Sequence, residues 1–234
     1  MVLQQKVALV TGGTGALGSV LAQRLADEGA QVVISYPTDK DVEGKDGTFR
    51  PGIVPMRADL TNEADVIALY DALVQKYFHI DIVINAVGGF LPAKPLADVT
   101  LAEWDRMMDI NLKSTFLSTR EALRRMKGRH YGRIINISAM VGLNPTAGKA
   151  PYAISKAGVS LLTDIVAQEQ KGTGITINAI APSIILTPAN LAWAEEGEAS
   201  KWVKPAEIAD LIIYLCSASA GAITGTTFKA YGGV

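Results

Sequence analysis

Apolar positions along this chain follow two alternating patterns: short continuous runs, and longer segments in which apolar residues recur every three or four positions. Continuous runs are typical of strands buried on both faces of a parallel sheet, and the longer period is typical of helices with one buried face. The strand candidates are residues 7–11, 32–36, 53–57, 81–86, 133–138, 175–181 and 226–230, and the helix candidates are 16–28, 62–77, 100–127, 151–170 and 205–217. This alternation predicts an α/β fold of the Rossmann type, a doubly wound parallel sheet of about seven strands with helices on both faces.

Polar residues and glycines mark the ends of several predicted helices. Thr61 and Thr100 precede helical segments and are candidate N-caps, while Gly29 and Gly128 follow helical segments and are candidate stops. Residues 37–52 are polar and contain Gly and Pro, so we expect a loop after the second strand.

Composition limits the classes of protein to consider. The 234 residues are 49% apolar, enough for a large core, and we expect one domain over residues 1–234. The 22 basic and 23 acidic residues leave a net charge of −1, which argues against nucleic acid or an anionic membrane as a partner. No apolar run approaches the roughly 18 residues of a membrane span, and no targeting segment opens the chain. We therefore expect a cytoplasmic protein.

Residues that could bind metal or form disulfides are few. The single cysteine, Cys216, lies in an apolar helical run and is predicted to be a buried packing residue in a reducing compartment. His79 and His130 lack the neighbouring ligands of a metal site, so no metal is predicted.

The strongest chemical signal is Tyr152-Ala-Ile-Ser-Lys156, with Ser138 upstream at the end of a predicted strand. Pro151 suits the first turn of a helix, which places Tyr152 and Lys156 one turn apart on the same face. A phenol has a pKa of about 10, and a nearby ammonium favours the phenolate. The motif therefore predicts a proton-transfer site in which Lys156 lowers the pKa of Tyr152.

A second signal is the glycine-rich turn after the first predicted strand. Residues 7–18 read VALVTGGTGALG, an apolar run followed by a turn and a helix. Small residues let the backbone approach a pyrophosphate, and the helix N-terminus offers it unpaired N–H groups. The turn thus predicts a dinucleotide site.

These motifs together resemble those of the short-chain dehydrogenase/reductase family, and the resemblance extends over essentially the whole chain. The family turn TGxxxGxG aligns with residues 11–18, with Ala16 in place of one glycine. Residues 85–88 are similar to its NNAG segment, and residues 182–187 resemble its PGxxxT turn, with Ser183 in place of glycine.

The resemblance implies a set of roles. Tyr152 would be the general acid or base, Ser138 the hydrogen-bond donor to the substrate oxygen, and Lys156 a support for Tyr152 that also reaches the nicotinamide ribose. Asn111 would hold a water that returns protons to Lys156. Together with Tyr152 and Lys156, the implied cofactor-binding residues are Gly12, Thr14, Gly15, Ala16, Leu17, Gly18, Tyr36, Asp59, Leu60, Asn85, Ala86, Val87, Gly88, Pro182, Ile185 and Thr187.

The choice between NAD and NADP depends on the end of the second strand. A carboxylate there would bind the ribose 2′-OH of NAD, whereas this chain has Tyr36. We therefore expect NADP, with Lys40 or Arg57 as partners of the 2′-phosphate. Asp39 or Asp41, if either folds back against the ribose, would instead favour NAD.

The family also implies a substrate lid and an oligomer. Residues 188–204, with Trp193 and Trp202, are the expected short lid. A mainly apolar pocket is expected from Phe90, Met140, Leu143, Ile184 and Leu191. We expect a homodimer or homotetramer built on the helices 100–127 and 151–170. Their surplus apolar residues are Met107, Met108, Phe116, Leu161 and Leu162.

The implied function is NAD(P)-dependent hydride transfer to or from a ketone or secondary alcohol of modest size. The substrate could be a 3-oxoacyl thioester, and a polyol, sugar or hydroxysteroid dehydrogenase remains an alternative. A non-catalytic dinucleotide-binding regulator or scaffold is the alternative of a different class.

Overall fold

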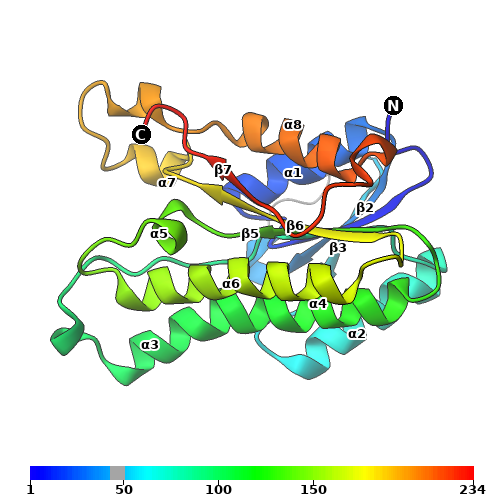
Figure 1. The fold of residues 1–234 in the computed structure, drawn as a ribbon, viewed down its shortest axis with the longest axis horizontal. Coiled ribbons are helices and arrows are strands. Elements are labelled where there is room, and N and C mark those ends of the chain that lie inside the picture. Colours follow the sequence, from blue (N-terminus) through cyan, green and yellow to red (C-terminus); the bar gives the residue numbers. More distant parts are fainter. Residues whose placement is uncertain (43–50) are drawn as a thin grey trace.

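The computed structural model describes residues 1–42 and 51–234, so most of the loop expected at 37–52 lies outside the described residues. Seven parallel strands form one sheet in the order β3-β2-β1-β4-β5-β6-β7 (Figure 1). The strands are β1 (Val7–Thr11), β2 (Gln31–Tyr36), β3 (Ile53–Arg57), β4 (Ile82–Asn85), β5 (Gly132–Ile137), β6 (Ile175–Pro182) and β7 (Thr227–Ala230). The predicted fold class is confirmed.

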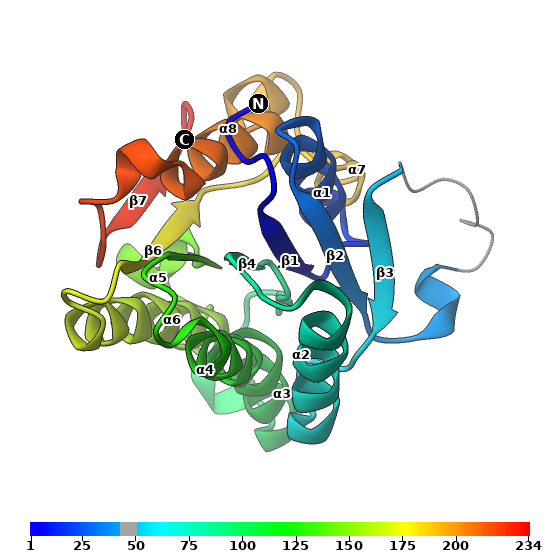
Figure 2. The same ribbon diagram turned by 90° about the vertical axis from the view of Figure 1, so that its right-hand side faces the viewer.

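Helices cover both faces of the sheet, as Figures 1 and 2 show. α1 (Ala16–Asp27) and α8 (Pro205–Cys216) pack over one face, and α2 (Glu63–Tyr77), α4 (Ser114–Met126) and α6 (Ala150–Glu169) pack over the other. Strands β1, β4 and β5 are fully buried, which explains their continuous apolar runs. Cys216 is buried in the first of these layers, as predicted, and burial raises the pKa of its thiol to about 12.

The order of the strands positions the site. β1 pairs with β2 on one side and with β4 on the other, so the chain reverses its direction of travel across the sheet at β1. In open α/β sheets ligands bind beyond the carboxyl ends of the strands at such a point. In this chain the glycine-rich turn follows β1 and residues 85–88 lie at the end of β4.

The helix expected at 100–127 is divided into α3 (Leu101–Met107), a π-helical segment (Met108–Lys113) and α4. The hydroxyls of Ser114 and Thr115 donate to the carbonyls of Ile110 and Asn111, at 2.6 and 2.8 Å, so side chains compete for acceptors along this stretch. The π segment places Asn111, which is fully buried, in the interior.

Two predictions of helix caps have different outcomes. Thr100 caps α3 as expected, because its hydroxyl accepts from the N–H of Glu103. The prediction for Thr61 is wrong. The Thr61 hydroxyl donates to Asp59, and the side chain of Asn62 caps α2 instead.

Shorter elements complete the chain. These are α5 (Met140–Leu143), α7 (Pro188–Leu191) and the 3-10 turns Asp39–Asp41, Leu96–Asp98, Glu198–Lys201 and Ala218–Ala220. The predicted stops Gly29 and Gly128 have φ of +92° and +78°, a backbone region that favours glycine. In the part of the chain that the structure describes, no helix is both long and apolar enough to span a membrane.

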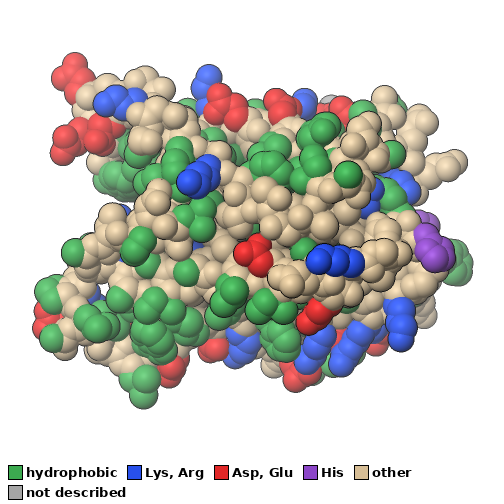
Figure 3. Space-filling model, in the orientation of Figure 1, with side chains coloured by type: hydrophobic (Ala, Val, Ile, Leu, Met, Phe, Trp, Pro, Cys, Tyr) green, Lys and Arg blue, Asp and Glu red, His purple; other side chains and the backbone are tan. Residues whose placement is uncertain are grey.

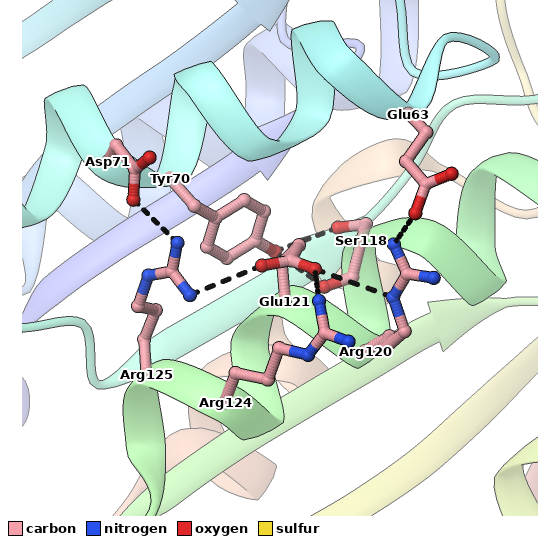
Figure 4. A network of polar contacts seen from close by, with 8 residues as sticks. All are labelled: Glu63, Tyr70, Asp71, Ser118, Arg120, Glu121, Arg124 and Arg125. Carbon is pink, nitrogen blue, oxygen red and sulfur yellow. Dashed lines mark hydrogen bonds and ion pairs between the residues drawn. The ribbon is translucent and has the colours of Figure 1, made fainter.

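A network of charges joins α2 to α4 (Figure 4). The carboxylate of Glu121 is almost fully buried and contacts Arg124 and Arg125 at 2.6 and 3.2 Å, with Arg120 at 3.4 Å. Arg120 and Arg125 continue to carboxylates of α2, which connects the two helices. Three arginines of α4 therefore form ion pairs within the fold.

Candidate active site

Tyr152 and Lys156 lie in the first turns of α6, which begins at Ala150 and has Pro151 in its first turn. Tyr152 packs against the small buried cluster of Ala139, Val141 and Ala153. The ring of Phe90 meets the Tyr152 ring edge to face, with centroids 5.4 Å apart and an interplanar angle of 84°. Since the side chain of Phe90 is 54% exposed, it presents apolar surface beside the phenol.

Lys156 of α6 is buried between the end of β5 and the segment after β4. Its Nζ donates to the carbonyl of Ile137 at the end of β5, at 2.8 Å. Burial lowers the pKa of Lys156 to about 8. A Cβ on Gly88 would lie 2.9 Å from Oδ1 of Asn111 and 3.1 Å from Nζ of Lys156. The glycine after β4 therefore lets the backbone pass close to both side chains.

The expected lowering of the Tyr152 pKa is wrong for this structure. Burial raises the pKa of Tyr152, because a phenolate loses its hydration in the apolar cluster. The ammonium of Lys156 is directed to Ile137. No side chain among the described residues forms a hydrogen bond to the Tyr152 hydroxyl.

The side chain of Asn111 connects the loop after β4 to α6. Its Oδ1 accepts from the N–H of Gly89 at 2.9 Å, and its Nδ2 donates to the carbonyl of Gly89 and to the Ser155 hydroxyl, each at 3.1 Å. The amide is thus engaged by protein groups, and the proton-relaying water stays a prediction. Ser155, which lies inside the Tyr152–Lys156 motif, is a further residue of the site that the sequence pattern did not indicate.

Ser138 does not have the partners that its predicted role requires. Its side chain is 2% exposed, its hydroxyl donates to the carbonyl of Lys156 at 2.9 Å, and it lies 2.9 Å from the Ser160 hydroxyl. The Ser138 hydroxyl has one proton, and it donates that proton to the carbonyl of Lys156 in α6. In this structure Ser138 is therefore not available to donate to a substrate oxygen. The following residue, Ala139, is the one that packs with Tyr152.

The glycine-rich turn leaves the start of α1 open to a ligand. Gly15 is the N-cap and makes no side-chain cap, while Gly15 and Ala16 are exposed. Gly12 has φ of +65°, and a Cβ on Gly18 would overlap the carbonyl oxygen of Gly12. These glycines allow the tight turn, and the free N–H groups at the helix start suit a pyrophosphate.

The segment after β4 is held against this turn. The hydroxyl of Thr11 accepts from the N–H groups of Ala86 and Val87, at 3.1 and 3.4 Å. The side chain of Asn85 points into the core and donates to Thr119 and Asn136, so a cofactor contact at this position would come from its backbone. The side chain is buried because alternate side chains of a strand between two helical layers face the layers rather than the sheet edge.

At the end of β2, Tyr36 is partly exposed and has no carboxylate partner among the described residues. Asp39 forms an ion pair with Arg57 at 3.4 Å, and Asp41 accepts from the Thr38 hydroxyl at 2.7 Å.

The other predicted contacts near the adenosine have structural roles as well. Asp59 accepts from the N–H and the hydroxyl of Thr61, each at 2.8 Å, and Leu60 is buried in the core. Through its bonds to Thr61, Asp59 stabilises the turn that precedes α2.

The segment after β6 forms the far side of the site. Pro182 ends β6, Ile185 pairs with Val203 in an isolated bridge, and Thr187 caps α7 through the N–H of Asn190. Within 188–204, Trp193 is 57% exposed and packs on Trp202 with centroids 5.2 Å apart. Trp202 is 4% exposed, so it packs beneath Trp193 in the interior and has no surface available to a ligand.

The two histidines lie in the turns before β4 and β5, and His130 has a φ of +57°. His79 lies 3.1 Å from the carboxylate of Asp81, and the described residues hold no cluster of three metal-ligating side chains.

Comparisons with known proteins show the family to which this chain belongs. A family model described as short chain dehydrogenase matches residues 6–197. The chain is 32% identical to 3-oxoacyl-[acyl-carrier-protein] reductase of Vibrio cholerae, covering 100% of this chain and 99% of that protein. It is 33% identical to 3beta-hydroxysteroid dehydrogenase 1 of Eggerthella lenta, covering 99% and 94%.

A crystal structure of a proposed gluconate dehydrogenase from Agrobacterium tumefaciens has a TM-score of 0.91 at 31% identity, covering 99% of this chain and 96% of that one. The similarity to these proteins covers essentially the whole chain, including the glycine-rich turn and the Tyr152–Lys156 pair. The chain belongs to the short-chain dehydrogenase/reductase family of oxidoreductases.

Proposed function

We propose that this enzyme transfers a hydride between NADP or NAD and a ketone or secondary alcohol of modest size. The observation that carries the proposal is the position of Tyr152 and Lys156 at the start of α6, with Lys156 beside Gly88 and the carboxyl end of β5. This edge of the sheet also holds the open N-terminus of α1.

The residues fit a nicotinamide dinucleotide. The uncapped start of α1 would hold the pyrophosphate, the backbone at 86–88 would border the nicotinamide side, and Lys156 would reach the ribose hydroxyls. When bound, the cofactor supplies or accepts the hydride. The protein positions the reacting atoms and moves one proton.

The proton would pass through Tyr152. In reduction the phenol donates to the substrate oxygen, and in oxidation the phenolate takes the proton from the alcohol. The raised pKa of Tyr152 suits the donor role, because the hydroxyl is protonated at neutral pH. Lys156 would add positive charge nearby, and Asn111 would fix the loop at Gly89 against α6.

The comparisons with relatives support a carbonyl or alcohol substrate but not one particular compound. The relatives include a 3-oxoacyl-thioester reductase and a hydroxysteroid dehydrogenase, which act on carbonyls of very different shape. We propose that residues 188–204 are a lid of the single domain. The exposed apolar side chains of Phe90, Leu191 and Trp193 would then line the entrance.

A panel of carbonyl compounds, each assayed with NADPH and then NADH, tests this proposal. A 3-oxoacyl thioester, a sugar lactone, a steroid ketone and a cyclic ketone cover the alternatives. We expect oxidation of the cofactor with at least one of them. A folded protein that binds neither cofactor would contradict the proposal.

We propose NADP as the preferred cofactor, supported by Tyr36 in place of an acidic residue and by the local pairing of Asp39 and Asp41. Tyr36→Asp should add a carboxylate that accepts from the ribose diol and repels a 2′-phosphate. Hydrogen bonds to charged groups contribute about 1.5–3 kcal/mol, so the ratio of kcat/KM values should move toward NAD by roughly tenfold or more.

Two results of that experiment would count against the NADP preference. A wild-type preference for NADH of more than about tenfold would contradict it directly. An unchanged ratio in Tyr36→Asp would mean that the segment after β2, not the strand end, reads the ribose.

A further inference from the structure

Ser138 and Ala139, the two residues that follow β5, direct their side chains to different surroundings. The hydroxyl of Ser138 is directed into α6, where the carbonyl of Lys156 and the hydroxyl of Ser160 take up its hydrogen bonds. The side chain of Ala139 is directed to the cluster that contacts Tyr152. The backbone at Ala139 is extended, with φ of −159° and ψ of 155°, which places successive side chains on opposite sides.

The side of β5 that faces the phenol therefore carries a methyl group. A methyl group cannot donate a hydrogen bond, and among the described residues no side chain bonds to the Tyr152 hydroxyl. The Ser155 hydroxyl donates to the carbonyl of Tyr152 at 2.8 Å, so it is also occupied. A substrate oxygen beside Tyr152 would therefore have one side-chain hydrogen-bond donor, Tyr152, whereas the family resemblance implied two, Tyr152 and Ser138.

We propose that Tyr152 is the sole side-chain donor to the reacting oxygen in this enzyme, with Ala139 at the place of the missing second donor, and that its substrates are therefore activated carbonyls. This inference rests on the proposed function. Loss of one oxyanion donor typically slows a reaction by about 10²–10³-fold. A carbonyl that is conjugated with, or adjacent to, a second electron-withdrawing carbonyl needs less of that stabilisation, because its product oxyanion is less basic.

The reaction balances without another group. The C=O π bond breaks as its carbon receives a hydride, with two electrons, from the reduced nicotinamide. The oxygen then takes the proton of Tyr152. The carbonyl is reduced to an alcohol, the nicotinamide is oxidised, and Tyr152 regains a proton from solvent.

Substrate comparison is the first test. With the wild-type enzyme and saturating cofactor, 1,2-cyclohexanedione should be reduced at least about 10²-fold faster than cyclohexanone, beyond their difference with sodium borohydride in solution. Equal preference after that correction would overturn the proposal. No reduction of any carbonyl, by any variant, with either cofactor would instead overturn the proposed function itself.

Variants at β5 provide the second test. Ala139→Ser would add a hydroxyl on the side of the phenol, and we expect kcat for cyclohexanone to rise at least about tenfold while kcat for the dione changes less than threefold. An unchanged kcat for cyclohexanone in a variant of wild-type cofactor affinity would contradict the assignment of Ala139.

Ser138→Ala and Ser160→Ala both remove the buried hydrogen bond between these two hydroxyls, and Ser138→Ala also removes the bond to the carbonyl of Lys156. If Ser138 is structural, both variants should lose thermal stability, Ser138→Ala more than Ser160→Ala, and both should keep kcat within about threefold per folded enzyme. A loss of 10²-fold or more in Ser138→Ala alone, with an intact fold and unchanged cofactor Kd, would show that Ser138 is the donor and the proposal is wrong.

Discussion

At the scale of single residues, the site depends on one phenol whose hydroxyl is free of protein partners among the described residues. Tyr152→Phe keeps the ring that packs on Ala139 and Phe90 but removes the transferable proton. We expect kcat to fall by about 10²–10⁴-fold with nearly unchanged cofactor Kd. Single-turnover kinetics and a cofactor titration measure the two effects. Tyr214→Phe, at a half-exposed tyrosine of α8, is the control, and a kcat above one third of wild type in Tyr152→Phe would refute the assigned role.

The buried ammonium of Lys156 predicts how stability varies with pH. Burial lowers its pKa from 10.5 to about 8, so between these values the unfolded chain holds a proton that the folded chain has lost. Stability from this group therefore rises with pH through that window. Replacing the ammonium by an apolar chain in Lys156→Met should remove a cost of up to about 3 kcal/mol at pH 7.

Urea unfolding of the cofactor-free proteins at pH 7 and pH 9.5 measures that difference. The advantage of Lys156→Met over wild type should shrink as the pH rises above 8. A constant difference across this range would mean that Lys156 titrates at its ordinary pKa in the folded protein.

At the scale of elements, the contact between α2 and α4 depends on the buried carboxylate of Glu121 (Figure 4). Glu121→Gln keeps the shape but leaves Arg124 and Arg125 near an amide that carries no charge. Breaking a buried ion pair costs about 3–5 kcal/mol, and the partial exposure of the arginines should reduce this to about 2–3 kcal/mol. Urea unfolding at pH 7 should show this loss. The control Glu63→Gln removes an exposed carboxylate and should cost less than about 1 kcal/mol; equal losses would contradict the role of burial.

At the scale of the whole molecule, one apolar surface has no partner within the described chain. Apolar side chains gather over the helices α3 and α6 on the face shown in Figure 3. Exposed apolar residues of these helices and of the neighbouring α4 are Ile154, Leu161 and Ile165 on α6 and Phe116 on α4, between 42% and 60% exposed. Two residues predicted for an interface are used elsewhere, because Met107 is fully buried and Leu162 packs against the core.

We expect this surface to associate in a homodimer or homotetramer. Light scattering at micromolar concentration should give a mass of two or four chains, and Leu161→Asp should lower it by placing a charge in the contact. Phe78→Asp is the control, since Phe78 is 85% exposed at the end of α2 and away from this surface. A monomeric wild type would refute the prediction.

Sequence alone determined the features that depend on local patterns. The period of apolar residues fixed the strands, because a strand buried on both faces must be apolar at nearly every position, as β1 and β4 are. The helical spacing of Tyr152 and Lys156 placed both at one turn of α6, and Thr100 capped α3 as its pattern indicated.

Only the tertiary structure decided where individual polar groups point. Ser138 directly follows β5 and Asn85 ends β4, yet their side chains bond to α6 and to the core, because buried polar groups need hydrogen-bond partners. The pKa of Tyr152 likewise depends on burial of its side chain against the apolar cluster of Ala139, Val141 and Ala153. Spacing along the chain places a residue on an element, whereas hydrogen-bond partners and burial come from elements distant in sequence, and these settle what its side chain can do.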